Sequence, residues 1–351
     1  MKIAIGIGGG PGPMGADWEG AASFLQEAEK LGVDSAWSAE TWGFDAATPI
    51  GFMAARTKSI KLGTGIMQLG SRSPAMLAMT AMTLNSLSGG RFRLGLGASG
   101  PQVVEGWHGV RFANTLPRIR DAINIIRLVT SGEKVAYKGD YYELPLPGGE
   151  GKALRSSAPA MDIPIYLATL SPKALELTGE LANGWVGTSF MPEHADVFFD
   201  HIAKGAAKGG RTLKDVDLQV AAGVVQFGDD VEKLIAPRKP GLAFTLGAMG
   251  SRQHNFYNAA YRRAGYADEA VAVQKLWLEG KRDEAAALVP EEMVLQTNLI
   301  GTEQMVRQRV RVHRDAGVNT LRVQPEGKTL SDRLENLGRI VRIVQEETGK
   351  S

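Results

Sequence analysis

The sequence predicts an α/β protein folded as a single (β/α)8, or TIM, barrel over residues 1–351. Strand-like runs alternate with amphipathic helical stretches from one end of the chain to the other. Eight such runs occur, each followed by helical sequence, and no break in composition divides the chain. Several runs are apolar on both faces, as strands of a buried parallel sheet are. A doubly wound open sheet is the alternative, which the count of eight disfavours.

The first half of the chain contributes four of the predicted strands. The helix after the first strand spaces its apolar residues from Trp18 to Leu31 along one face. Ser73 and Pro74 begin the helix after the third strand, as N-cap and first-turn residue. A helix over 115–131 follows the fourth strand and leads into a polar, hairpin-like stretch. These four strands are expected at residues 2–8, 35–40, 61–67 and 92–98.

The second half contributes the other four strands and one long insertion. A helix begins at Ser171-Pro172 after the fifth strand, and the last helix places five apolar residues at helical spacing from Leu330 to Val344. Roughly ninety residues separate the seventh strand from the eighth, far more than an ordinary connection. We interpret approximately 229–300 as a helical cap inserted over one barrel face. The four strands are expected at residues 163–169, 184–189, 218–227 and 320–325.

The stretch "FRLGLGASGP", residues 92–101, contains a G-x-G-x-x-G pattern at Gly95, Gly97 and Gly100. A dinucleotide-binding turn needs this pattern after the first strand, a helix opening within it, and an acidic residue after the next strand. Here it ends the fourth strand, and the acidic residue at the expected distance, Asp121, lies inside a helix. We therefore expect these glycines to allow close packing, or close approach to a ligand at the barrel rim.

Composition narrows the possible classes of function. The 40 basic and 38 acidic side chains nearly cancel, so we expect neither a nucleic-acid partner nor a membrane surface. The absence of cysteine excludes disulfides and thiolate chemistry and fits a reducing cytoplasm. The apolar N-terminal run is too short for a secretory leader, and no later run is long enough to span a membrane. We therefore expect a cytoplasmic protein.

Several familiar catalytic signatures are missing. The five histidines have no metal-ligand spacing, so we expect no metal site. Neither a G-x-S-x-G elbow nor a Walker A loop occurs. Met76, Met79 and Met82 recur at helical spacing and are expected to fill the core. His108, beside Trp107 in a loop, is a candidate catalytic group, although an exposed or hydrogen-bonded structural histidine is the more common case.

What remains is a set of polar or small residues at the carboxyl ends of strands, where barrel enzymes build their sites. Backbone, hydroxyls, one carboxylate and one amide suit a flat cofactor with polar edges. The helix beginning at Ser171-Pro172 offers free N–H groups to a phosphate. Each residue taken singly also fits ordinary turn chemistry. The set comprises Gly8, Gly9 and Gly10; Glu40, Thr41 and Trp42; Gly65, Ile66, Met67 and Gln68; Ser99, Gly100 and Gln102; Ala168, Thr169, Leu170 and Ser171; and Gly187, Thr188 and Ser189.

Four segments together resemble the bacterial luciferase-like superfamily. The likeness is greatest to its branch that uses the deazaflavin coenzyme F420, the methylene-tetrahydromethanopterin-reductase-like oxidoreductases. The segments are "LGTGIMQLGSRSPAMLAMTAMTL", "LSGGRFRLGLGASGPQVVEGWHG", "IPIYLATLSPKALELTGELANGW" and "LIGTEQMVRQRVRVHRDAGVNTLRV". The resemblance runs over nearly the whole chain and implies a luciferase-like barrel, hydride transfer to or from a small organic substrate, and a homodimer.

The resemblance also assigns roles to rim residues. It implies a non-proline cis peptide at Gly65-Ile66, which presses behind the central ring of the deazaflavin. Glu40 matches the acidic position that faces the cofactor and the active site, and Ser99 to Gln102 match the turn that lines the ring. The segment Ala168 to Ser171, together with Thr188 and Ser189, matches the residues that hold the ribityl-phosphate arm.

The chain departs from two branches of the family. The sugar-phosphate dehydrogenases have a histidine and a glutamate where this chain has Thr41 and Gly100. The pterin reductases carry a carboxylate near the end of the first strand, where this chain has three glycines, residues 8–10. We therefore expect neither of these two substrates.

The expected chemistry is hydride transfer, with the cofactor supplying the reactivity and the protein supplying orientation and a dry pocket. Glu40 is the first candidate for a proton relay, Gln68 for orienting the substrate, and His108 is the third. In the cap, three cations are candidates to meet the acidic tail of the cofactor, unless they are simply solvated: Arg238, Lys239 and Arg252. A flavin-mononucleotide (FMN) monooxygenase of the same fold and a non-catalytic flavin-binding protein remain the alternatives.

Overall fold

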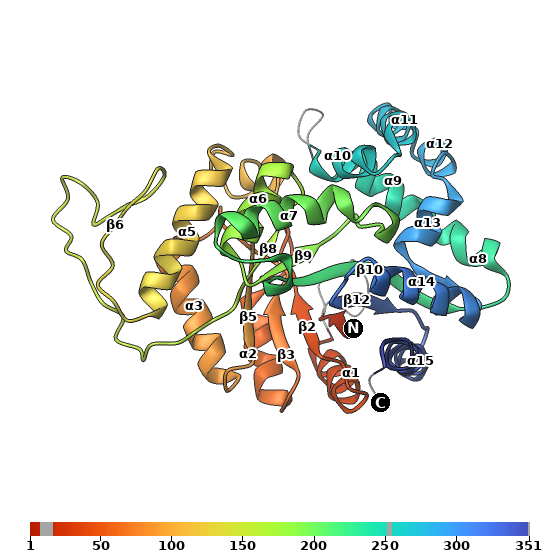
Figure 1. Cartoon of the computed structure of the whole chain (residues 1–351), viewed down its shortest axis with the longest axis horizontal. Helices are drawn as coiled ribbons and strands as arrows, with labels where there is room; N and C mark the ends of the chain where they lie inside the picture. Colours follow the sequence, from red (N-terminus) through yellow and green to blue (C-terminus); the bar gives the residue numbers. More distant parts are fainter. Residues whose placement is uncertain (8–16, 251–254, 350–351) are drawn as a thin grey trace.

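Eight parallel strands close into a barrel in the computed structural model, which describes residues 1–7, 17–250 and 255–349 (Figure 1). The last barrel strand pairs with the first, with Lys2 opposite Thr320, so the sheet has no open edge there. This confirms the predicted barrel and excludes the open sheet. The strands, in spatial order, are β1 (Lys2–Gly6), β2 (Ser35–Ser38), β3 (Lys61–Thr64), β5 (Phe92–Gly97), β8 (Ile165–Ala168), β9 (Gly184–Gly187), β10 (Asp217–Phe227) and β12 (Thr320–Pro325).

Helices surround the barrel and bury its outer face. Ser73 caps α3 by accepting a hydrogen bond from the Met76 N–H, as the sequence predicts. The last helix buries Leu337, Val341 and Val344 as predicted, while Leu330 at its first turn is exposed. The outer helices are α1 (Trp18–Lys30), α2 (Ala47–Arg56), α3 (Pro74–Leu87), α5 (Thr115–Thr130), α6 (Pro172–Leu181), α7 (Asp196–Lys208), α14 (Glu303–Asp315) and α15 (Leu330–Thr348).

Between β10 and α14 the chain forms a group of short helices with a core of its own, on the right of Figure 1. They are α8 (Val231–Ile235), α9 (Lys239–Ala248), α10 (Phe256–Arg263), α11 (Ala267–Leu278), α12 (Arg282–Ala287) and α13 (Glu291–Thr297). We call this group the cap helices. Residues 299 and 300, which were predicted to lie in the helical insertion, belong instead to a short strand, β11 (Leu299–Gly301), which pairs with the far half of β10.

An arm projects on the opposite side of the barrel, at the left of Figure 1, and contains the hairpin of β6 (Tyr137–Lys138) and β7 (Glu143–Leu144). The buried carboxylate of Asp121 on α5 anchors this hairpin. It accepts hydrogen bonds from the Tyr137 hydroxyl at 2.8 Å and from two backbone N–H groups, those of Tyr141 and Tyr142. Asp121 is therefore a structural residue rather than a ribose ligand.

Two aromatic rings pack inside the barrel, and neighbouring glycines leave room for them. Trp37 of β2 and Tyr166 of β8 meet edge to face, with ring centroids 5.3 Å apart. A Cβ placed on Gly63 would lie 2.5 Å from the Trp37 ring, and one on Gly95 would lie 1.7 Å from the Thr64 carbonyl oxygen. Gly95 of the G-x-G-x-x-G stretch therefore serves close strand packing.

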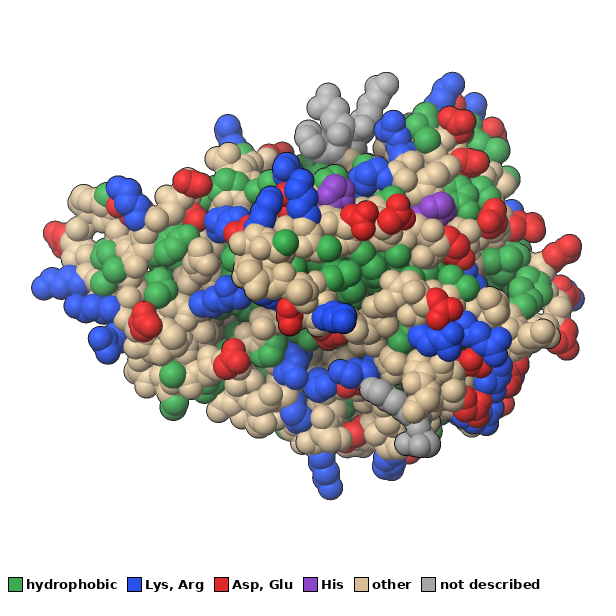
Figure 2. Space-filling model, viewed as in Figure 1, with side chains coloured by type: hydrophobic (Ala, Val, Ile, Leu, Met, Phe, Trp, Pro, Cys, Tyr) green, Lys and Arg blue, Asp and Glu red, His purple; other side chains and the backbone are tan. Residues whose placement is uncertain are grey.

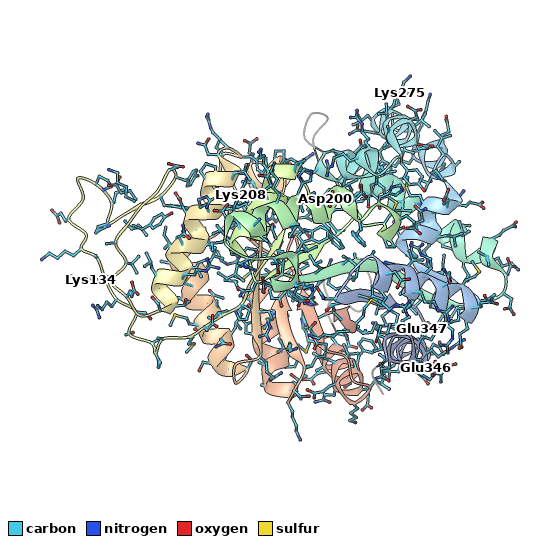
Figure 3. All side chains as sticks on the ribbon, in the orientation of Figure 1. Lys134, Asp200, Lys208, Lys275, Glu346 and Glu347 are labelled. Carbon is cyan, nitrogen blue, oxygen red and sulfur yellow. The ribbon has the colours of Figure 1, made fainter. Side chains whose placement is uncertain are left out.

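Charged side chains of both signs are interspersed on the face drawn in Figure 2. Some form bridges between outer helices: Glu347, labelled on α15 in Figure 3, accepts hydrogen bonds from Arg307 and Arg311 of α14. Within the part of the chain that the structure describes, no helix has both the length and the apolar character to cross a bilayer.

Replacing Gly95 by Ala should destabilise the barrel, because the added methyl group must displace the Thr64 carbonyl or move β3 away from β5. We expect a loss of about 1–3 kcal/mol in the free energy of unfolding, as for overpacking in a tight core. The measurement is urea denaturation. Gly241→Ala in α9 is the control, since a Cβ there meets nothing within 4 Å, and it should leave stability unchanged or raise it. Equal stability of the two variants would contradict this account.

Candidate functional site

The predicted site residues lie at one end of the barrel. Because all eight barrel strands run parallel, their carboxyl ends share a single rim. The residues predicted after β2, β3, β5, β8 and β9 are therefore brought to that rim. Gly8, Gly9 and Gly10, expected after β1, lie outside the described residues.

Glu40, which follows β2, is held by a dense set of hydrogen bonds. Both carboxylate oxygens accept hydrogen bonds from the guanidinium of Arg72, at 2.6 and 3.1 Å. The backbone N–H groups of Gln68 and Ala46 donate to the same two oxygens, one each. With 8% of its side chain exposed, Glu40 is a largely buried partner of an arginine. The arrangement ties the turn after β2 to the turn that follows β4 (Met67–Gln68).

Gln68 presents a buried acceptor with no partner among the described residues. Its amide nitrogen donates to the Thr41 carbonyl at 2.9 Å, which fixes the orientation of the side chain. Its Oε1 atom, on a residue only 1% exposed, receives no hydrogen bond. A buried amide oxygen without a donor is costly, and such a group in a native structure often marks a ligand position.

The peptide bond between Gly65 and Ile66 is cis, as the resemblance implied. A Cβ on Gly97 would lie 3.0 Å from the Ile66 side chain, so the second glycine of the glycine-rich stretch makes room for this residue. Met67 is fully buried and belongs to the core rather than to an open surface. Gly65 and Ile66, in contrast to Met67, are partly exposed and can contact a cofactor.

Two serines at equivalent places adopt left-handed backbone conformations. Ser99 follows β5 with φ of 59°, and Ser189 follows β9 with φ of 51°. A non-glycine residue in this region is uncommon and persists where the surroundings enforce it. Both were predicted to contact the cofactor. Gly100 then caps the short helix α4 (Pro101–Val104), in which Gln102 is exposed.

The turn from β8 into α6 offers donors for an anion. The Ser171 side chain caps none of the first-turn N–H groups of α6, and a helix N-terminus with open N–H groups favours negative charge. Arg263 of cap helix α10 donates to the Leu170 carbonyl at 2.6 Å, which places a guanidinium beside this turn. In contrast, the Thr169 hydroxyl bonds to Thr178 within the core.

Arg322 of β12 is a residue that sequence reasoning missed. Its guanidinium donates to the Gly187 carbonyl at 2.8 Å and lies near Gly65, so it joins two predicted cofactor contacts. Tyr257 of α10 approaches it from the cap, and no carboxylate of residues 1–7, 17–250 or 255–349 forms an ion pair with it. Burial lowers the pKa of Arg322 to about 10, which still leaves it charged at neutral pH. The available signal was a lone charge within the apolar strand "TLRVQP".

Other predicted residues lie at the surface or in ion pairs. Thr41, Trp42 and His108 are exposed. Arg238 pairs with Glu326 at 2.9 Å and Lys239 with Glu291 at 3.8 Å, whereas Arg252 lies outside the described residues. The described part of the chain contains no group of three or more side chains suited to hold a metal ion.

The protein-family model of the luciferase-like monooxygenases matches residues 1–320. The chain belongs to this family. A protein of Mycobacterium tuberculosis with the provisional name coenzyme F420-dependent oxidoreductase is 40% identical over 309 residues, which cover 86% of this chain and 89% of that protein.

Two solved structures share the fold of this chain. The coenzyme F420-dependent tetrahydromethanopterin reductase of Methanopyrus kandleri superposes with a TM-score of 0.76 at 23% identity, over 96% of both chains. An F420-dependent secondary alcohol dehydrogenase, solved with an F420-acetone adduct, gives a TM-score of 0.74 at 19% identity, over 98% of this chain and 99% of that one.

The Glu40–Arg72 pair should couple strongly in a double-mutant cycle. Glu40→Gln or Arg72→Met alone leaves its partner without the bidentate contact, and we expect each to cost about 1–3 kcal/mol of unfolding free energy. The double variant should cost less than the sum of the two. Denaturant titration of all four proteins gives the coupling energy. Additive losses would show that the two side chains act independently.

Proposed function

We propose that this chain is a coenzyme F420-dependent oxidoreductase that transfers a hydride between the deazaflavin and a small organic substrate. The observation that carries the proposal is the rim itself. In a chain of the luciferase-like family, two buried polar atoms near this rim, Gln68 Oε1 and Arg322 Nε, have no hydrogen-bond partner among the described residues. An acceptor without a donor and a guanidinium without a carboxylate call for a ligand with both donors and negative charge.

The residues present fit the deazaflavin. A planar ring with polar edges can donate to Gln68 Oε1, which the protein leaves without a donor. The open N–H groups at the start of α6, with Arg263 beside them, suit the phosphate of the side arm. The left-handed turns at Ser99 and Ser189 follow the ends of β5 and β9, at the same rim.

When bound, the deazaflavin supplies the hydride chemistry, and the chain supplies orientation and exclusion of water. Within this proposal Glu40 is a positioning residue, because both of its oxygens are already occupied by Arg72 and by backbone N–H groups. It fixes Arg72 and the turn that carries Gln68. The proton relay expected of Glu40 from the sequence, and the role of His108, stay predictions.

The proposal is tested by binding and then by turnover. The purified protein, freed of endogenous ligand, should bind F420 at least about tenfold more tightly than FMN when fluorescence is titrated. Reduced F420 should then be reoxidised by at least one member of a panel of imines, electron-poor alkenes and ketones. Tighter binding of FMN would favour the monooxygenase alternative. Binding without any turnover would favour a non-catalytic flavin-binding protein.

Arg322→Met should weaken F420 binding by about tenfold to a hundredfold, because it removes the positive charge beneath the rim. Arg322→Lys should retain part of the affinity. The unfolding free energy of Arg322→Met should not fall, since the residue removed is a buried charge without a carboxylate partner. Arg311→Met is the control, an arginine paired with Glu347 on the outer helices. Unchanged F420 affinity in Arg322→Met would exclude this role.

A further inference from the structure

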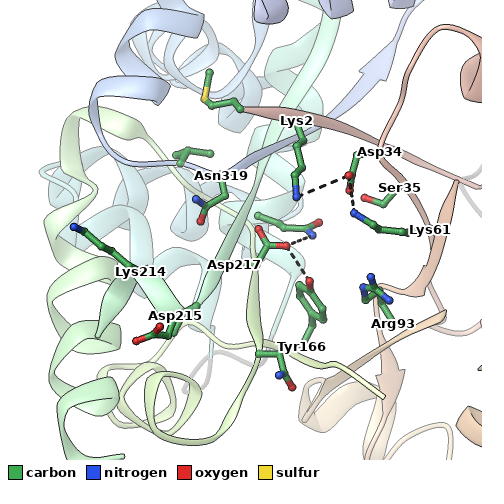
Figure 4. A pocket seen from close by; sticks show the side chains of 15 residues that line it. Lys2, Asp34, Ser35, Lys61, Arg93, Tyr166, Lys214, Asp215, Asp217 and Asn319 are labelled. Atoms are coloured by element: carbon green, nitrogen blue, oxygen red, sulfur yellow. Dashed lines mark hydrogen bonds and ion pairs between the residues drawn. The ribbon is translucent and has the colours of Figure 1, made fainter. Parts of the chain in front are cut away.

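A cavity of about 460 Å³ lies at the opposite, amino-terminal end of the barrel (Figure 4). The first residues of the strands line it, among them Lys2, Ser35 and Lys61, together with Arg93 of β5. Its volume is that of a site for a small organic molecule, well above the space that one or two waters need. Neither the family nor the proposed hydride transfer assigns it a role.

The charged side chains around this cavity do not all pair with one another. One carboxylate, Asp34, serves two lysines, Lys61 at 2.8 Å and Lys2 at 3.9 Å. Arg93 donates to the Phe92 carbonyl and forms no ion pair with any described carboxylate. The wall formed by Lys2, Lys61 and Arg93 therefore carries excess positive charge. Figure 4 shows Lys61 and Arg93 on the same side of the cavity.

The side of the cavity formed by Asp217 and Gln219, which we call its floor, carries hydrogen-bond acceptors instead. Asp217 accepts hydrogen bonds from the Tyr166 hydroxyl and from the Gln219 amide nitrogen, both at 2.9 Å, and Lys214 lines the same cavity. Burial raises the pKa of Tyr166, so this phenol stays a donor to Asp217. Gln219 is 2% exposed, and its Oε1 atom receives no hydrogen bond. Because the amide nitrogen is committed to Asp217, the oxygen faces away from it and needs a donor.

These two halves ask for opposite charges on one ligand. An anionic group suits the position next to Arg93 and Lys61, and a group with N–H donors and positive charge suits the position next to Asp217 and Gln219 Oε1. A small anion alone would leave the floor without a donor, and a small amine would leave Arg93 without a counter-charge. Water satisfies hydrogen bonds but neither charge.

We propose that this cavity is a second binding site, which takes a small zwitterion of amino-acid type, with its carboxylate at Arg93 and Lys61 and its ammonium at Asp217 and Gln219. The site lies beyond the Trp37–Tyr166 pair from the rim, so its occupant is not the substrate of the proposed hydride transfer. The inference does not depend on F420.

The full chain is titrated calorimetrically with glycine, β-alanine and 4-aminobutyrate, and thermal unfolding is followed in parallel. At least one of them should bind at concentrations up to about 50 mM and raise the melting temperature. Butyrate, butylamine and inorganic phosphate, which each carry one kind of charge, should bind at least about tenfold more weakly.

Arg93→Met and Asp217→Asn should each lower the affinity for that zwitterion by at least about tenfold. Gln219→Leu should also lose binding, yet unfold at the same or a higher temperature, since it removes a buried acceptor without a donor. Lys134→Met on the arm is the control and should bind as the wild type does. The far-UV circular dichroism spectrum and a cooperative thermal transition report whether each variant is folded.

Two results would overturn the proposal. One is that none of the three zwitterions binds the wild type, or that a singly charged probe binds as tightly. The other is that Arg93→Met, Asp217→Asn and Gln219→Leu, each folded, bind the zwitterion unchanged. Neither result bears on the cofactor at the other rim.

Discussion

The close approach of β3 and β5 governs the geometry of this barrel. The Thr64 hydroxyl donates to the Gly95 carbonyl at 2.8 Å and accepts from the Gly95 N–H at 2.9 Å, so one side chain stitches the two strands together. No Cβ fits between them. Immediately beyond this contact the chain turns through Gly65 and Ile66, and the Ile66 side chain lies against Gly97. The position of the rim follows from a backbone contact that only glycine permits.

Two arginines near the rim differ in whether the protein itself neutralises their charge. Arg72 has its carboxylate in Glu40, whereas Arg322 has only carbonyl oxygen and a nearby phenol. An unneutralised guanidinium beneath a pocket lowers the stability of the free protein and is tolerated where a ligand compensates for it. The two arginines thus have different surroundings: Arg72 fixes the turn that carries Gln68, and Arg322 is the proposed contact for the ligand.

Much of this architecture could be predicted from the sequence, because its signals are local. The eight strands, the Ser73 cap and the helix at 115–131 follow from periodicity and turn chemistry. The short strand β11 was missed, since three apolar residues after a helix give no period to measure. The strand ends predicted that Glu40 and Gln68 lie at the rim, but Arg72 as partner of Glu40 is a contact over 32 positions that no local pattern encodes. Arg322 was not predicted as a site residue, because the sequence alone does not show whether its side chain points into the barrel or out of it.

The Trp37 and Tyr166 rings lie between the two ends of the barrel and separate them. With Ala4 and Val186 they form a small apolar cluster across the bore. Hydrocarbon and aromatic carbon therefore stand between the two mouths of the bore, and they set the polar groups of the amino-terminal cavity apart from those of the rim.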